Sequence, residues 1–251
     1  MSTEASSAGG SRVIEFPRPP RPRRRWLRWV AAALVVAGLI GVGAVLYFSS
    51  VLAVDRVSVS GTRVVPQDQV EQRLEALHGI PLPQVGQGRV EQALAGVPGI
   101  DRVSVLAAPP TGLDVQITEY EAVGRAGDAE RPDVLMADGS IVTAVPEQRL
   151  EESDVVALDQ RVTAAQPAVR MAVADTITRL TPEVRDAVAE VSARSSTDIR
   201  LTLVDGEVVL WGDAHEAELK AGVLATLVQT DGALDGVTEI DVSVPERPVT
   251  R

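Results

Sequence analysis

The chain has 251 residues, with 35 acidic and 24 basic side chains, a formal net charge of −11 and no cysteine. Residues 1–28 carry seven Arg and two Glu, which leaves −16 on the rest; so acidic a domain argues against nucleic acid or anionic lipid as its partner, because both require a basic surface. Without cysteine, this sequence forms no disulfide, thiolate nucleophile or metal thiolate.

Residues 1–28 contain the segments SSAGGS and PRPPRPRRR. Gly, Ser, Pro and clustered like charge cannot build a hydrophobic core, so we expect a disordered, Arg-rich cytoplasmic stub. The Arg cluster either binds acidic lipid headgroups or only sets the membrane orientation, and the second interpretation is the simpler one.

A transmembrane helix is predicted over residues 29–50, inside an uncharged run from Val30 to Val54. About 20 apolar residues are enough to cross the hydrocarbon layer as a helix. The strongly apolar part of this run is Val30 to Phe48. Aromatic residues mark both of its ends, as is typical of membrane interfaces: Trp26, Trp29, Tyr47 and Phe48. A cleaved signal peptide has a shorter apolar region, and a buried core helix rarely lacks charge over such a length.

Basic residues are retained on the cytoplasmic side of a membrane. Seven Arg precede the uncharged run, whereas Asp55 and Arg56 balance each other after it. We therefore expect a single-pass type II protein of the cell membrane, with a cytoplasmic N-terminus and an exterior C-terminal domain.

Three small residues, Ala33, Ala37 and Gly41, recur at four-residue spacing within the span. Small residues let two helices approach closely, so these three are candidate helix-pairing residues. The alternative is chance, because spans rich in Ala and Gly often show this spacing.

Residues 51–120 show the order strand, helix, helix, strand, strand. The strands are indicated by alternation and the helices by three- and four-residue spacing of apolar side chains. The positions are Val57 and Val59; Val70, Leu74 and Leu77, with Pro66 as first helical residue; Val90, Leu94 and Val97; Val103 and Val105; and Leu113, Val115 and Ile117 after a turn at Pro109–Gly112.

Residues 121–245 are predicted to be mostly β, with two or three helices. The strands are expected at Val134–Met136, Ile141–Val145, Val155–Leu158, Ile199–Leu203, Val208–Trp211 and Val237–Val244, and the helices after Pro167, Pro182 and Asp213. Asp213 and Glu216 form a candidate capping box for the last helix, whose buried face would carry Leu219, Val223 and Leu227.

The sequence lacks residues that known catalytic motifs require. His215 and Glu216 begin a zinc-protease pattern, but Leu219 stands where the second His is required. Lys220 would need a Ser at position 217 for a Ser-x-x-Lys pair, and Ala217 is there. Carboxylate pairs without aromatic residues to bind sugar do not indicate a glycosidase. The sequence predicts no enzyme, catalytic residue, cofactor, metal site or small-molecule substrate.

Five stretches resemble the bacterial cell-division family FtsQ/DivIB, in particular its actinobacterial members. They are VDRVSVSGTRVVPQDQVEQRL, VPGIDRVSV, LDVQITEYEAVG, VVLWGDAHEAELKAGVLATLVQ and VTEIDVSVPERPVTR. Glu119 fits the acidic residue that usually follows the last POTRA strand, whereas Ala122 stands where the family has Pro. The resemblance implies an α+β chain: one transmembrane helix, a POTRA-like βααββ domain (51–120), an FtsQ-type β domain (121–245) and a short tail (246–251).

The last predicted strand is a candidate partner-binding site. A terminal strand often lies at a sheet edge and accepts another chain by β-augmentation, as do the edges of the POTRA-like strand pair. We expect Ile240, Val242 and Val244 to face the core; the alternative is that they merely complete the sheet. The candidate partner-binding residues are Val237, Thr238, Glu239, Ile240, Asp241, Val242, Ser243, Val244, Pro248 and Val249.

The resemblance also implies a function. Members of the family are scaffolds of the divisome that link early and late division proteins. They bind FtsB-like and FtsL-like single-pass partners outside the membrane and coordinate septal peptidoglycan synthesis, so enrichment at the division septum is expected. Two alternatives remain: a single-pass sensor or regulator with an exterior ligand-binding domain, and a POTRA chaperone of outer-membrane assembly, for which the sequence lacks repeats and barrel strands.

Overall fold

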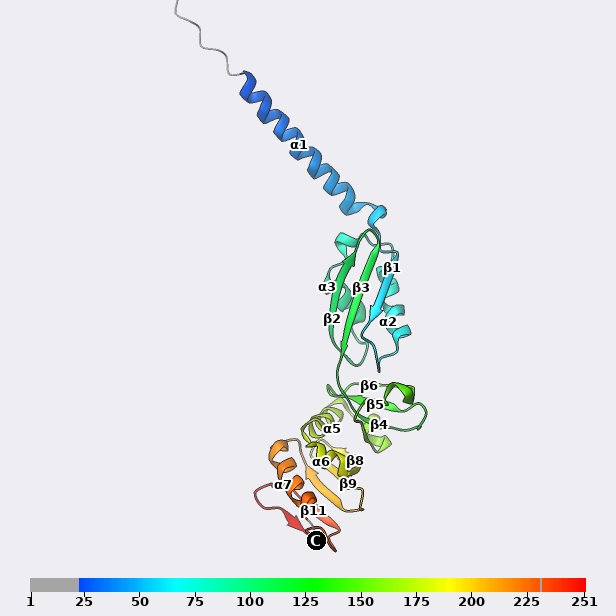
Figure 1. Cartoon of the computed structure of the whole chain (residues 1–251), viewed down its shortest axis with the longest axis vertical. Helices are drawn as coiled ribbons and strands as arrows, with labels where there is room; N and C mark the ends of the chain where they lie inside the picture. The colour runs from blue at the N-terminus through cyan, green and yellow to red at the C-terminus, as the bar shows by residue number, and fades with distance from the viewer. Residues whose placement is uncertain (1–22, 231) are drawn as a thin grey trace, which may run out of the picture. The chain divides into compact units, whose positions relative to one another are not determined.

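The computed structural model describes residues 23–230 and 232–251 (Figure 1). The chain divides into two compact units, Met1–Phe48 and Ser49–Arg251. One apolar helix followed by mixed sheets with helices confirms the expected α+β class.

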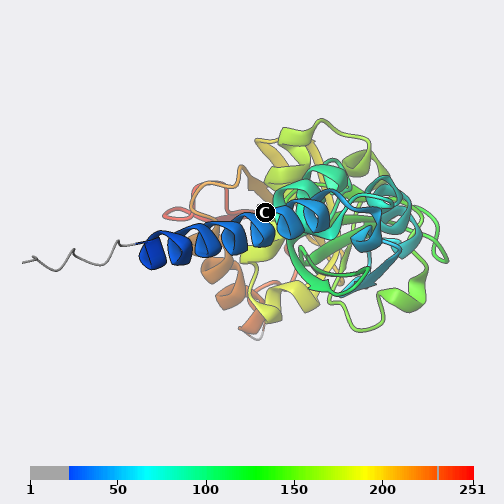
Figure 2. The same cartoon turned by 90° about the horizontal axis from the view of Figure 1, so that it is seen from above.

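The first unit contains a single unbroken helix, α1 (Arg23–Phe48), which Figures 1 and 2 both show. Within the described residues it is the one helix long and apolar enough to cross a membrane, over Trp26–Val45 at a mean hydropathy of 2.0. The helix begins six residues before the predicted span, because Arg is a good helix former and nothing after Pro22 interrupts it. Disorder was therefore wrong for residues 23–28, and the rest of the predicted stub, residues 1–22, lies outside the described residues.

The helix ends at Phe48, two residues before the predicted boundary. Ser49 then caps a short 3₁₀ turn, η1 (Ser50–Leu52), by accepting the N–H of Val51 on its hydroxyl at 3.2 Å. Ser and similar residues favour such caps because their side-chain oxygen satisfies a backbone donor that has no helical partner.

Residues 51–120 form the expected βααββ order. The elements are β1 (Arg56–Ser60), α2 (Gln67–Leu74), η2 (Glu75–Leu77), η3 (Leu82–Gln84), α3 (Gln87–Leu94), β2 (Ile100–Ala108) and β3 (Gly112–Glu119). The sheet order is β1-β3-β2, with β1 parallel and β2 antiparallel to β3. The apolar positions identified on α2, namely Val70 and Leu74, are buried against this sheet.

The next segment forms a four-stranded sheet of order β6-β5-β4-β7. Its elements are β4 (Ala122–Ala126), β5 (Asp133–Met136), β6 (Ile141–Val142), η4 (Glu147–Arg149) and β7 (Val156–Ala157). The predicted hairpin is present as β5 and β6, with Gly139 at φ +78° in its turn. Strand β4 was not predicted, because it is buried at nearly every position and so lacks the alternation of a half-exposed strand.

The last part forms a five-stranded sheet of order β12-β11-β10-β9-β8. Its elements are α4 (Gln160–Thr163), α5 (Pro167–Arg179), α6 (Pro182–Ala187), β8 (Val188–Ser195), β9 (Asp198–Leu203), β10 (Val208–Gly212), α7 (Ala217–Gln229), β11 (Glu239–Asp241) and β12 (Val249–Thr250). The predicted helix starts at Pro167 and Pro182 are confirmed, and Thr181 caps α6 by accepting the N–H of Val184.

Two hydrophobic cores hold the second unit together. One is built around the five-stranded sheet and includes the fully buried Trp211. The other lies under the POTRA-like sheet, but it also takes in Met136 and Val142 from β5 and β6. The hydroxyl of Ser140, in the turn between β5 and β6, accepts the N–H of Gly99 from the POTRA-like domain at 3.0 Å. The POTRA-like domain therefore shares its core with the sheet that follows it.

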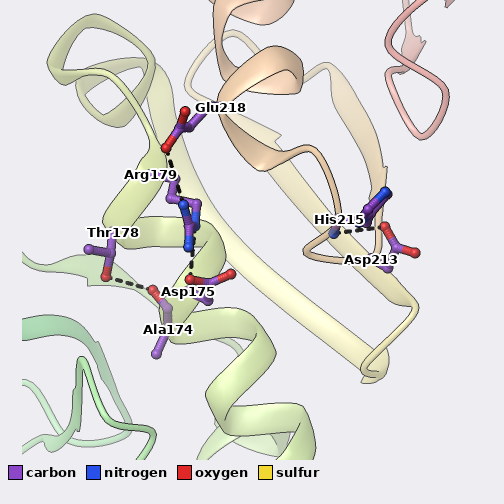
Figure 3. Close-up of polar contacts among 7 residues, drawn as sticks. All are labelled: Ala174, Asp175, Thr178, Arg179, Asp213, His215 and Glu218. Carbon is purple, nitrogen blue, oxygen red and sulfur yellow. Dashed lines mark hydrogen bonds and ion pairs between the residues drawn. The ribbon is translucent and has the colours of Figure 1, made fainter.

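The N-terminus of α7 differs from its prediction. The capping box does not form: Glu216 has φ +52° and makes no side-chain cap, and Asp213 instead accepts the N–H of His215 at 3.0 Å (Figure 3). The helix buries Lys220, which is 1% exposed, whereas Leu219 is 50% exposed. Leu219 was therefore wrongly predicted to be buried, because the Lys220 ammonium finds partners inside the fold. Val223 and Leu227, the other two residues of the predicted face, are partly buried against the core.

Candidate partner-binding surface

The predicted partner strand does not lie at the edge of its sheet. It is shorter than predicted, Glu239–Asp241 (β11), and lies between β10 and β12. Its parallel register with β10 sets Ile240 opposite Val209. Its antiparallel register with β12 sets Ile240 opposite Thr250 and Asp241 opposite Val249. The expectation of an open edge on this strand was wrong, because the residues after Pro245 fold back and cover it.

The backbone N–H and C=O groups of β12 face in two directions, toward β11 or away from the sheet. Arg251 exchanges hydrogen bonds with Glu239: its N–H donates to the Glu239 carbonyl at 2.9 Å, and its carbonyl accepts the Glu239 N–H at 3.1 Å. In an antiparallel pair the inward and outward residues alternate. The N–H and C=O of Val249 therefore also face β11, whereas those of Thr250 face away from the sheet.

Some candidate partner-binding side chains are buried and others are exposed. Ile240 and Val242 are fully buried, as predicted. Val244 was predicted to face the core but is 55% exposed. The reason is a turn at the end of β11, where Asp241 accepts the backbone N–H of Ser243 at 2.9 Å and its hydroxyl at 2.7 Å. The hydroxyl contact lowers the pKa of the Asp241 carboxyl below its usual value.

An exposed surface remains at this end of the sheet, which we call the β12 edge. Its members are Val244, Pro248, Val249, Thr250 and Arg251. Val249 is 46% exposed although it is apolar, and the guanidinium of Arg251 pairs with the Glu239 carboxylate at 3.2 Å. Sequence reasoning missed Thr250 and Arg251, because two residues are too few to show a strand period. Pro245 and Pro248, which frame the return of the chain, were the only signal.

The candidate helix-pairing residues lie on α1 and are exposed within the first unit: Ala33, Ala37 and Gly41. A side chain added at Gly41 would meet nothing within 4 Å. Residues four apart lie on one face of a helix, so the three present a single shallow strip.

The residues tested for catalysis have structural contacts. Lys220 donates to both the backbone carbonyl and the carboxylate of Asp213 at 3.0 Å, and its ammonium lies 6.0 Å from the centre of the Trp211 ring. The bond from Lys220 lowers the pKa of the Asp213 carboxyl. Within the described residues, no three His, Cys, Asp or Glu side chains are grouped to hold a metal ion.

A second ionic contact joins two helices of the same core. Arg179 at the end of α5 bonds Asp175 of its own helix at 2.9 Å and Glu218 of α7 at 3.2 Å (Figure 3). The bond to Asp175 raises the pKa of the Arg179 guanidinium. These pairs are exposed and join elements of the fold, so we assign them no chemistry.

A groove of about 910 Å³ runs from α4 and the loop after it over the end of β8 to β9 and the start of β10. It is open and carries charged and hydroxyl side chains, including Arg161, Arg194 and Ser195. A defined apolar pocket with convergent polar groups would favour the sensor alternative. The groove therefore gives the sensor alternative no support.

Comparison with known proteins agrees with this architecture. The family model for the POTRA domain, FtsQ-type, matches residues 52–120, and the model for the C-terminal part of cell division protein FtsQ/DivIB matches residues 128–243. The chain is 31% identical to the cell division protein FtsQ of Streptomyces collinus, over 100% of this chain and 99% of that protein. It is 33% identical to the FtsQ of Streptomyces coelicolor, over 98% of this chain and 94% of that protein.

Among solved structures, the chain is similar to the major extracytoplasmic domain of the trans isomer of the cell division protein DivIB from Geobacillus stearothermophilus. The identity is 15%, the match covers 47% of this chain and 92% of that chain, and the TM-score is 0.29.

Proposed function

We propose a scaffolding role for this chain, which belongs to the FtsQ/DivIB family of bacterial cell-division proteins. In this proposal the chain is a non-enzymatic, single-pass component of the divisome. Its exterior domain binds FtsB-like and FtsL-like membrane proteins, links early to late division proteins, and coordinates septal peptidoglycan synthesis carried out by others.

The observation that carries the proposal is the β12 edge. It combines the outward N–H and C=O of Thr250 with the exposed apolar side chain of Val249. A partner strand that lies along β12 can form main-chain hydrogen bonds with Thr250 and side-chain contacts with Val249. These are the two components of β-augmentation. Because β12 is so short, only a small number of main-chain bonds is available, and side-chain contacts must contribute strongly to specificity.

The site differs in one respect from the sequence hypothesis. Glu239 and Asp241 direct their backbone toward β12, so a partner cannot use them unless β12 is displaced. Deleting residues 237–251 would remove the buried Ile240 and Val242 and damage the core, so that deletion does not test binding. Ser243→Pro is also unsuitable, because the Ser243 N–H is bonded to its neighbour Asp241 rather than free at an edge.

Two proline variants test the edge. Thr250→Pro removes the outward donor and leaves the β11 ladder intact, whereas Val249→Pro removes an inward donor and loosens β12. We expect Thr250→Pro to weaken co-purification of the FtsB-like partner by about tenfold, and Thr250→Ala to have little effect. Equal binding by Thr250→Pro and Thr250→Ala would refute augmentation on β12.

Membrane anchoring is the role that we propose for α1. We propose that the Arg-rich end stays in the cytoplasm and that residues 49–251 lie outside, since seven Arg precede the apolar span. A reporter active only in the cytoplasm, fused after Arg251, should be silent; activity there would contradict this orientation. A fluorescent fusion is expected to gather at mid-cell septa, and a uniform membrane signal would count against the divisome role.

The strip formed by Ala33, Ala37 and Gly41 is proposed as the contact between α1 and the helix of a partner. Van der Waals packing between small residues drives such association in lipid. Gly41→Leu should reduce pairing in a membrane two-hybrid assay, whereas Gly43→Leu, on a different face of the helix, serves as the matched control.

A further inference from the structure

The groove that runs over β8, β9 and the start of β10 is a separate surface from the β12 edge, which is the opposite edge of the five-stranded sheet. Three guanidinium groups line it, from Arg161, Arg194 and Arg200, together with two carboxylates, from Asp159 and Asp198. Its lining is therefore net positive, although residues 29–251 together carry a charge of −16.

Both carboxylates of the groove are already occupied. Asp159 caps α4 by accepting the N–H of Arg161 at 2.8 Å, and Asp198 pairs with the guanidinium of Arg200 at 2.9 Å. The side chains of Arg161 and Arg194 are exposed and form no ion pair with any acidic group in the described part of the chain. Two guanidinium groups thus remain free to bind an anion, and their planar donors match carboxylates well.

The groove also contains an open strand edge. β8 is the outermost strand of its sheet. Among the described residues, the one bridge on its outer side joins Leu158 and Val191, and the Val191 carbonyl accepts the N–H of Asp159 at 2.9 Å. Residues two apart on a strand direct their backbone groups to the same side. The N–H and C=O of Ala193, which lines the groove, therefore face outward beyond the end of this bridge.

We propose that this groove binds an acidic peptide segment of a partner protein in an extended conformation. The segment pairs its backbone with β8 at Ala193 and places carboxylates on Arg161 and Arg194. An extended peptide uses both the strand edge and the free guanidinium groups. An anionic polymer would use only the positive charges. The two carboxylates of the lining leave only a small excess of positive charge for it.

The test uses the full-length protein in nanodiscs of neutral lipid, panned against a displayed library of short random peptides. We expect enrichment of acidic sequences. The most enriched peptide should bind about tenfold more weakly to Arg161→Glu and to Arg194→Glu, since each replaces a charge-assisted contact by repulsion. Arg102→Glu changes an exposed Arg on β2 and is the matched control, expected to bind like the parent chain.

Three results would overturn the proposal. The first is a selection without acidic enrichment. The second is an equal loss of binding in the Arg102→Glu control, which would indicate unspecific attraction. The third is tight binding of inorganic polyphosphate that matches the affinity of the peptide and displaces it. The groove would then be a site for polyanions in general. Thr250→Pro should leave this binding unchanged, so a failure here is distinct from a failure at the β12 edge.

Discussion

The carboxylate of Glu119, at the end of β3, accepts the backbone N–H of Val65 at 2.9 Å, although the two residues are 54 positions apart. It also accepts the N–H groups of Arg63 and Val64, each at 2.9 Å. Three successive donors directed at one anion form a backbone nest. The contact ties the last POTRA-like strand to the segment that leads into α2, which explains physically why an acidic residue suits this corner.

Glu119→Gln should destabilise residues 49–251 by about 2 kcal/mol, because it removes the charge and presents an amide donor to N–H groups. Urea unfolding of this segment measures the change. Glu121→Gln is the control: its side chain is 62% exposed, so we expect a change within about 0.5 kcal/mol. Similar losses in the two variants would show that the nest does not contribute to stability.

Gly61→Ala should be more damaging than Gly79→Ala. Both glycines have positive φ, +88° and +79°, which costs any other residue about 1 kcal/mol. Of the two, only Gly61 would place the added Cβ in collision with a backbone atom, the carbonyl oxygen of Ile117. The melting temperature of the Gly61 variant should fall well below that of the Gly79 variant, and equal values would contradict the collision.

Lys220→Ala should destabilise the fold by about 2 kcal/mol, because it leaves a cavity beside Trp211 and removes the two hydrogen bonds to Asp213 in the loop before α7. Leu219→Ala should cost less than about 1 kcal/mol, since Leu219 is half exposed. Chemical unfolding compares the two. A larger loss for the leucine would mean that α7 is rotated relative to this structure.

The link between Asp213 and Lys220 predicts a small acid-sensitive contribution to stability. The native pKa of Asp213 is lowered, so its contribution is fully present above the carboxyl pKa of the unfolded chain, about 3.9, and is lost as the pH falls through the lower native value. Asp213 is about half exposed, which keeps the effect below about 1 kcal/mol. Asp213→Asn should flatten the stability profile below about pH 4, and an unchanged profile would contradict the link.

The βααββ order and the long apolar helix could be predicted from the sequence, because both are encoded locally. The spacing of apolar residues indicates which face of each element is buried: they alternate at Leu113, Val115 and Ile117, and they follow helical spacing at Val70 and Leu74. A long uncharged run next to an Arg cluster likewise needs no tertiary partner to be recognised.

Tertiary contacts decided the rest. The period of α7 suggested Leu219 as a core residue, but Lys220 is buried instead, because Asp213 and the Trp211 ring supply partners that local spacing cannot reveal. The strand containing Ile240 was recognised by its alternation. Its place inside the sheet depends on β12, a return of two residues stabilised entirely by pairing with a strand eight or more positions away. Local periodicity determines which side of an element is buried, whereas the identity of the sheet edge depends on which distant strand pairs with it.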